Sequence, residues 1–253
     1  MKKAFDNKKN RDYFISVAMA TYNGEKFIKE QIESILNNLN YNDEIIISDD
    51  GSRDKTIEII KDIKDERIKL IGGPQKGVIK NFENAIKNCN GRYIFLADQD
   101  DIWMNNKVEK VLDFFEEEKC ECVVHDAIVV NGDMSKIIMP SYFKSRKTRE
   151  GKISNIIKPS YLGCCMAFSR NMLNYVLPFP EKIEMHDRWI GSVCDTFGKV
   201  KFLNECLIKY RRHGNNVSEM HRNSIATIIK NRIILINYLR KLKNTGNYTK
   251  DNI

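Results

Sequence analysis

Residues 93–101 read YIFLADQDD, and this stretch decides the predicted fold. The apolar residues 93–96 are typical of a buried strand, and Asp98 and Asp100 follow where that strand ends. Two carboxylates at this spacing are delivered to the rim of a sheet. Carboxylate oxygens are the ligands that hard divalent cations prefer, and such a cation can hold a diphosphate. The alternative for a single acidic pair is a turn or a helix N-cap.

A second acidic pair favours a ligand site over a turn. Asp49 and Asp50 follow the apolar residues 44–47, which are typical of another strand. Open α/β sheets bind ligands at the carboxyl ends of their strands, so we expect both pairs at one edge. Asp49 and Asp50 can accept hydrogen bonds from the imide N–H of a nucleobase and from ribose hydroxyls. Asp54, by contrast, is predicted to cap the next helix.

The first half of the chain alternates between strands and helices. Strands are predicted at residues 14–20, 44–48, 68–71 and 92–97, and helices at 24–38, 54–64 and 77–88. This alternation predicts an α/β fold with a mixed, mainly parallel sheet flanked by helices.

The second half is less regular. Helices are predicted at 107–118 and 187–197, a long strand or a strand pair at 120–130, and strands at 163–169 and 200–210. Residues 135–159 are basic and lack periodicity, which predicts a mobile loop with one short helix at most. Residues 221–243 contain no acidic residue and predict a basic amphipathic helix. Such a helix either packs on the sheet or a second subunit, or lies on an anionic membrane.

Composition limits the class of protein. The chain has 253 residues and a net charge of +8, which suits a globular protein with anionic partners such as phosphates, acidic lipid or nucleic acid. Seven cysteines without a C-x-x-C pair predict reduced core thiols and no zinc site. The polar, basic residues 1–12 are unlike a secretory signal, and no apolar run approaches a membrane span. A cytoplasmic location is therefore expected.

Three more clusters offer candidate site residues. Residues 21–24, TYNG, end the first strand, and Tyr22 there can stack on a nucleobase. Residues 184–189, EMHDRW, open a helix and can supply a general base. Residues 210–216, YRRHGNN, follow a strand, where Arg211 and His213 can bind diphosphate or complete a metal shell. The structural alternatives are rim packing, a helix cap and a solvated basic loop.

The order of these motifs resembles that of the family-2 inverting glycosyltransferases. The likeness covers roughly residues 15–218, with TYNG at 21–24, DDGSRD at 49–54, DQDDIW at 98–103, HDRW at 186–189 and YRRHGNN at 210–216. The DQDDIW and MHDRW forms are most similar to the bacterial rhamnosyltransferase-like branch of surface-polysaccharide synthesis. Two details depart from the family pattern. His186 stands where the family often has Glu, and Gln75-Lys76-Gly77 replaces its Asn-x-Gly.

The resemblance implies a GT-A fold. Residues 1–130 would form the nucleotide-sugar-binding half, residues 131–220 the acceptor-binding and catalytic half of the same domain, and residues 221–253 the C-terminal helix. Asp187 would be the catalytic base, and Asp100 and His213 would hold Mn²⁺ or Mg²⁺. The remaining roles are nucleotide binding by Thr21, Tyr22, Asn23, Asp49, Asp50 and Asp98, and diphosphate or acceptor binding by Arg188, Trp189 and Arg211.

The implied activity is that of a metal-dependent, inverting hexosyltransferase. Its donor would be dTDP-rhamnose or a UDP-hexose, and its acceptor a glycan or lipid-linked hydroxyl, with weak contact to the inner-membrane surface. A dinucleotide enzyme or nucleotidyltransferase would need a glycine-rich turn after the first strand, which is absent. The other alternative is a non-catalytic basic module that binds phosphate or membrane. Acids clustered at strand ends argue against nucleic acid as a partner.

Overall fold

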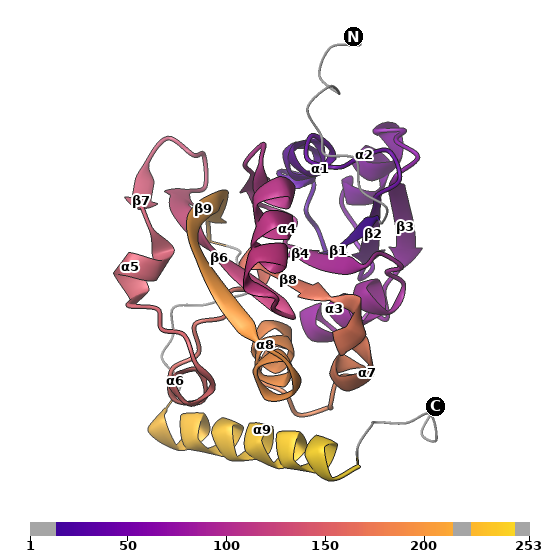
Figure 1. Cartoon of the computed structure of the whole chain (residues 1–253). Coiled ribbons are helices and arrows are strands. Elements are labelled where there is room, and N and C mark those ends of the chain that lie inside the picture. The colour runs from indigo at the N-terminus through magenta and orange to yellow at the C-terminus, as the bar shows by residue number, and fades with distance from the viewer. Residues whose placement is uncertain (1–13, 215–223, 246–253) are drawn as a thin grey trace.

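The computed structural model describes residues 14–214 and 224–245. The described residues form a nine-stranded sheet in the order β3-β2-β1-β4-β8-β6-β9-β5, with β7 paired to β6 (Figure 1). Helices flank the sheet, so the predicted fold class is confirmed. The predicted Asn216 and residues 221–223 of the tail lie outside the described residues.

The first half of the chain builds the parallel part of the sheet. Its strands are β1 (Ile15–Thr21), β2 (Glu44–Asp49), β3 (Ile68–Gly72) and β4 (Tyr93–Ala97). Helices α1 (Ile28–Leu36), α2 (Thr56–Asp62) and α3 (Val78–Lys87) connect them. In the register, Thr21 is opposite Asp49 and Met19 is opposite Ala97. The three strands therefore end at one edge, which brings the two acidic pairs together as predicted.

The second half extends the sheet with mixed strand directions. Strand β8 (Met166–Ser169) is antiparallel to β4 and β6 (Cys122–Asn131), and β9 (Val200–Arg212) is parallel to β6. The short strand β5 (Ile102–Trp103) pairs with β9. Helices α4 (Lys107–Glu118), α7 (Leu173–Val176) and α8 (His186–Phe197) complete this half. The predicted strand 163–169 is wrong in its first part, because residues 163–165 form a 3-10 turn.

The prediction that residues 135–159 form a loop with one short helix at most is also wrong. This segment contains β7 (Ile137–Met139), α5 (Tyr142–Arg146) and α6 (Lys152–Ile157). Buried Asp126 anchors it, because its carboxylate accepts hydrogen bonds from the Ser141 hydroxyl and from the Phe143 N–H at 2.8 Å. Helices of five and six residues are too short to show a 3.6-residue period in the sequence.

The C-terminal helix α9 (Ile225–Thr245) lies across one end of the molecule, next to α8 (Figure 1). It packs inward through Leu239 and Leu242, and the Tyr238 ring meets the Trp189 ring edge-on. None of the described helices has the length and apolarity that crossing a bilayer requires. All seven cysteines are free thiols, and six of them are buried, as the sequence predicted.

Candidate active site

A cleft of about 650 Å³ opens at the carboxyl ends of β1, β2 and β4. Its other walls come from α3, the 163–165 turn and the start of α8. Six of the predicted site residues line it, namely Thr21, Tyr22, Asp50, Asp98, Asp100 and Asp187. Residues more than 160 positions apart in the sequence therefore face a single cavity.

The loop of residues 98–101, here called the acidic loop, is held in place at several points. His213 Nε2 lies 2.7 Å from Asp100 Oδ2, and the His213 ring stacks on Phe27 at 4.8 Å. The Gln31 side chain donates to the Asp98 carbonyl at 2.7 Å. His213 was predicted to contact a metal or a diphosphate. In this structure its Nε2 holds the Asp100 carboxylate, which is how imidazoles often orient a metal-binding acid.

Arg211 supports the acidic loop from behind. Its Nε donates to the Asp100 carbonyl at 2.7 Å, its backbone N–H donates to Asp101 at 3.0 Å, and its guanidinium pairs with Glu30 at 2.7 Å. Arg211 is only 4 % exposed and does not line the cleft. The structure thus places it as a support, whereas the sequence suggested contact with diphosphate or acceptor.

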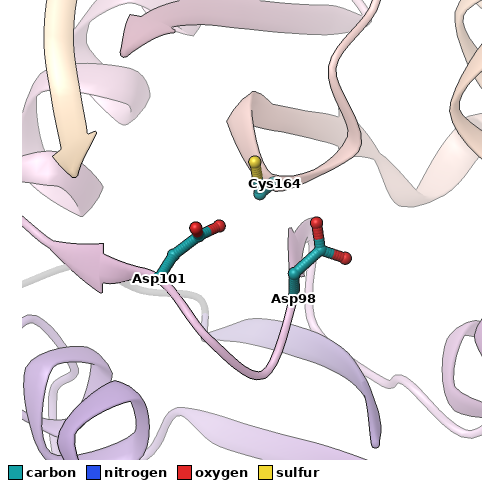
Figure 2. Close-up of side chains that lie close together, drawn as sticks. All are labelled: Asp98, Asp101 and Cys164. Carbon is teal, nitrogen blue, oxygen red and sulfur yellow. The ribbon is translucent and has the colours of Figure 1, made fainter. Parts of the chain in front are cut away.

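Asp98 lines the cleft, Asp101 and Cys164 lie behind it, and the three side chains point toward one another (Figure 2). One carboxylate oxygen from each aspartate and the Cys164 sulfur all lie within 4.8 Å of one another. Burial, together with the charges of Asp100 and Asp187, raises the pKa of Asp98 to about 7. Among the described residues, Asp101 Oδ2 has no hydrogen-bond partner. A positive charge nearby would stabilise the ionised form of these closely spaced carboxylates.

Lys107 supplies part of this positive charge. The sequence pattern did not indicate it as a site residue. The side chain is fully buried, and Nζ donates to the Cys164 carbonyl at 2.9 Å. Nζ also lies 3.9 Å from the centroid of the Trp103 ring, in a cation–π contact. Burial lowers the pKa of Lys107 to about 8, against the opposing pull of nearby thiols and carboxylates. The group therefore remains largely a cation at neutral pH.

Asp187 enters the cleft from the first turn of α8. Burial raises its pKa to about 6, although the Arg188 charge and the backbone N–H groups of Arg188 and Gly163 lower it. The Arg188 N–H donates to Asp187 at 2.6 Å. The neighbouring His186 ring stacks on Phe82 at 3.9 Å, and burial lowers its pKa to about 3. A carboxylate whose pKa lies near neutrality is suited to accept a proton.

Arg188 and Trp189 lie outside the cleft. Trp189 is 1 % exposed, and its indole N–H donates to the Val176 carbonyl at 2.8 Å. Arg188 forms an ion pair with Glu184, which also binds Arg232 of α9 at 2.9 Å. The sequence suggested that these two residues contact diphosphate or acceptor. The structure uses Trp189 to pack α8, and it uses Arg188 in the charge cluster between α8 and α9.

The loop after β1 carries Tyr22, whose side chain is 53 % exposed at the rim of the cleft. Gln99 of the acidic loop binds the Tyr22 backbone twice, since its Oε1 accepts at 2.9 Å and its Nε2 donates at 3.1 Å. A Cβ at Gly24 would lie 2.4 Å from Gln99 Oε1, so this pairing requires glycine there. The side chain of Asn23 accepts from the Arg53 N–H at 2.9 Å and stabilises the neighbouring turn.

Asp49 and Asp50 have different environments. Asp49 is 5 % exposed and accepts from Ser52 and from Thr21, so its carboxylate is used within the turn. Asp50 lines the cleft and accepts from the N–H groups of Gln75 at 2.6 Å and Gly77 at 2.8 Å. The pattern of residue types could not separate the two, because they are adjacent acids where β2 ends.

The donor set of the acidic loop fits a hard divalent cation. Asp98 and Asp100 offer carboxylate oxygens at the cleft, and behind them Asp101 keeps a buried oxygen that no residue in the described part of the chain binds. Oxygen donors of this kind suit Mg²⁺ and Mn²⁺.

Solved structures that superpose on this chain show its fold class. Staphylococcus aureus TarS (residues 1–349, in complex with UDP-GlcNAc) matches with a TM-score of 0.70 at 17% identity, over 89% of this chain and 66% of that one. A mannosyltransferase from Pyrobaculum calidifontis, in complex with GDP-Man and Mn²⁺, matches with a TM-score of 0.59 at 16% identity, over 81% and 59%. The fold is that of a GT-A-type glycosyltransferase.

The sequence then assigns the family. The model of glycosyl transferase family 2 matches residues 16–177, and the chain belongs to that family. An Escherichia coli UDP-Glc:alpha-D-GlcNAc-diphosphoundecaprenol beta-1,3-glucosyltransferase, WfgD, is 28% identical over 82% of this chain and 80% of its own length. An uncharacterized glycosyltransferase of Nostoc sp. is 28% identical over 80% of this chain and 66% of its own length. The chain thus spans about two thirds of several longer relatives.

Proposed function

We propose that this chain transfers a sugar, with inversion, from a nucleotide-diphosphate donor to a hydroxyl of a lipid-linked or glycan acceptor. The observation that carries the proposal is the cleft, in which Asp187 faces the acidic loop and has its pKa raised to about 6. The WfgD relative, which uses UDP-Glc, favours a UDP-hexose over dTDP-rhamnose as donor. We assign donor binding to residues 1–130, and acceptor binding and catalysis to residues 131–220.

The residues would divide the reaction between them. Tyr22 stacks on the base and Asp50 lies beside it, while Asp98 faces the ribose or the sugar. Asp100, oriented by His213, would hold Mn²⁺ or Mg²⁺, and the bound cation would supply positive charge to the leaving diphosphate. Asp187 takes the proton from the acceptor hydroxyl as that oxygen attacks the anomeric carbon from the face opposite the diphosphate. A single displacement of this kind inverts the anomeric configuration.

Nucleotide titration tests the donor half of the proposal. We expect isothermal titration to show that UDP binds more tightly than dTDP or GDP, and that Mn²⁺ strengthens the binding. Failure of all three nucleotides to bind, with and without Mn²⁺, would favour the non-catalytic basic module. The cleft gives that alternative little support, because its walls carry four carboxylates and one cation, Arg53, whereas a phosphate-binding module needs mainly cations.

The rate of transfer is expected to fall in acid. Asp187 must be ionised to act as base, and burial raises its pKa to about 6. A divalent cation at the acidic loop lowers that pKa, so the acidic limb should lie at or below pH 6 and fall about tenfold per pH unit. Initial rates at saturating donor and acceptor measure the limb, and circular dichroism at each pH separates it from unfolding. A rate that rises as the pH falls would contradict this role.

Gln99 is expected to act through Tyr22. Replacing Gln99 by Leu removes two hydrogen bonds to the Tyr22 backbone, so UDP affinity should fall about tenfold. In a Tyr22→Ala background the same substitution should cost little, because the stacking ring is already gone. Isothermal titration of the two single variants and the double variant measures this coupling. Asn131→Leu, which removes a side-chain amide from the β6–β7 turn, serves as control. Additive losses would show that Gln99 acts independently of Tyr22.

A further inference from the structure

The helices α6 and α9 leave apolar side chains in solvent. Ile225, Ile229 and Ile233 of α9 are 77 %, 54 % and 53 % exposed, and they recur every four residues. Ile153 and Ile157 of α6 are 75 % and 72 % exposed at the same spacing. Residues four apart lie on the same side of a helix, so each set forms a stripe. Exposed apolar stripes of this kind mark surfaces that bind something.

The side chains through which α9 packs on the rest of the protein are not those of the isoleucine stripe. Leu239 and Leu242 are buried, and Arg232 is fixed by Glu184 at 2.9 Å. These contacts hold the helix against α8, and none of the described residues buries the isoleucine stripe. Core packing therefore explains the leucines but leaves the three isoleucines unexplained.

All the charged side chains of α6 and α9 are cations. Residues 225–245 contain five cations and no acidic residue, and Lys230, Arg240, Lys241 and Lys243 are exposed. Helix α6 begins with Lys152, whose pKa is lowered by burial and also by the nearby Lys243 charge. Figure 1 shows α6 beside α9 at the same end of the molecule, which agrees with the effect of Lys243 on Lys152. Asp195 also acts on Lys152, but the charged residues of the two helices themselves are all cations. An apolar stripe on helices of this charge complements an anionic lipid surface.

We propose that α9 and α6 together form a docking surface for an anionic bilayer. The isoleucines enter the boundary between headgroups and acyl chains, while the lysines and arginines contact acidic headgroups. The proposal goes beyond sugar transfer, since it requires neither donor nor metal. It would hold the chain at the surface where a lipid-linked acceptor is found.

Vesicle flotation of the full chain tests the surface. We expect the wild type to float with phosphatidylglycerol-rich vesicles at low salt, and to be released by high salt or by pure phosphatidylcholine. The variant I225S/I229S/I233S should float poorly, and I153S/I157S should float less than wild type. Neutralising each exposed cation should reduce partitioning about fivefold. The matched control is I137S/I138S, which alters two isoleucines on β7 that are 58 % and 47 % exposed.

Several results would overturn the proposal. Wild type that stays in solution at low salt, or equal flotation of wild type and the α9 variant, excludes a membrane surface on α9. Unchanged flotation of the α6 variant excludes the two-helix surface. A dimer in light scattering that the α9 variant dissociates would show that a second copy covers the stripe. An unchanged melting temperature and unchanged UDP affinity of each variant establish that only the surface has been altered.

Discussion

The Asp187→Asn variant is expected to lose transfer while it keeps its affinity for the nucleotide. Asparagine preserves the size of the side chain but cannot accept the acceptor proton, so turnover should fall by about a hundredfold to ten-thousandfold. Nucleotide affinity should stay within about threefold, because the base acts on the acceptor and leaves the donor diphosphate alone. Turnover with saturating donor and titration with UDP and Mn²⁺ measure the two quantities separately.

Asp195→Asn provides the matched control for this experiment. Asp195 lies on the same helix, burial also raises its pKa, and the Tyr161 hydroxyl binds it away from the cleft. The same chemical change at this position should leave turnover close to wild type. If Asp187→Asn turns over at a near wild-type rate, another group removes the proton. An equal loss of UDP affinity would instead assign Asp187 to the donor site.

The Asp100→Ala variant is expected to lose the metal-dependent part of nucleotide binding. Its carboxylate lines the cleft and is oriented by His213 at 2.7 Å, as expected of a metal ligand. UDP affinity in the presence of Mn²⁺ should fall at least about tenfold. In excess chelator, the wild type and the variant should bind UDP with the same residual affinity. Isothermal titration in the two buffers measures all four values.

Asp133→Ala is the control, because Asp133 is an acidic residue on the β6–β7 turn and does not line the cleft. It should bind UDP as the wild type does in both buffers. Full transfer activity of the wild type in excess chelator would remove the metal from the proposed mechanism. It would leave the assignment of Asp187 as base untouched.

The parts of the site that sequence could predict are those that follow a strand directly. The isoleucines of β2 and all of β4 form short apolar runs, so the acids that end or follow these strands fall at a known edge of a parallel sheet. Cys164 and Lys107 gave no such signal. They reach the acidic loop because β8 joins the sheet antiparallel to β4 and because α4 follows β5. Pairings of this kind depend on long-range packing, which residue spacing does not encode.

The roles expected of Trp189 and Arg211 from their motifs differ from their places in the structure. Trp189 belongs to the HDRW motif, yet it lies on the buried face of α8 with Ile190 and Val193. Arg211 follows Tyr210 at the end of β9 and its side chain turns inward, where Nε donates to the Asp100 carbonyl and the guanidinium pairs with Glu30. Both side chains carry groups that bind ligands elsewhere, and in this fold the protein itself satisfies those groups.

The fixed acidic loop has a thermodynamic consequence. Gln31 binds the backbone of Asp98, Gln99 binds that of Tyr22, and His213 and Arg211 hold Asp100 before any donor arrives. The conformational entropy of the loop is therefore lost when the chain folds rather than when the donor binds. Ordering each free residue would cost about 1–2 kcal/mol, so the binding energy of the nucleotide is left for recognition and catalysis.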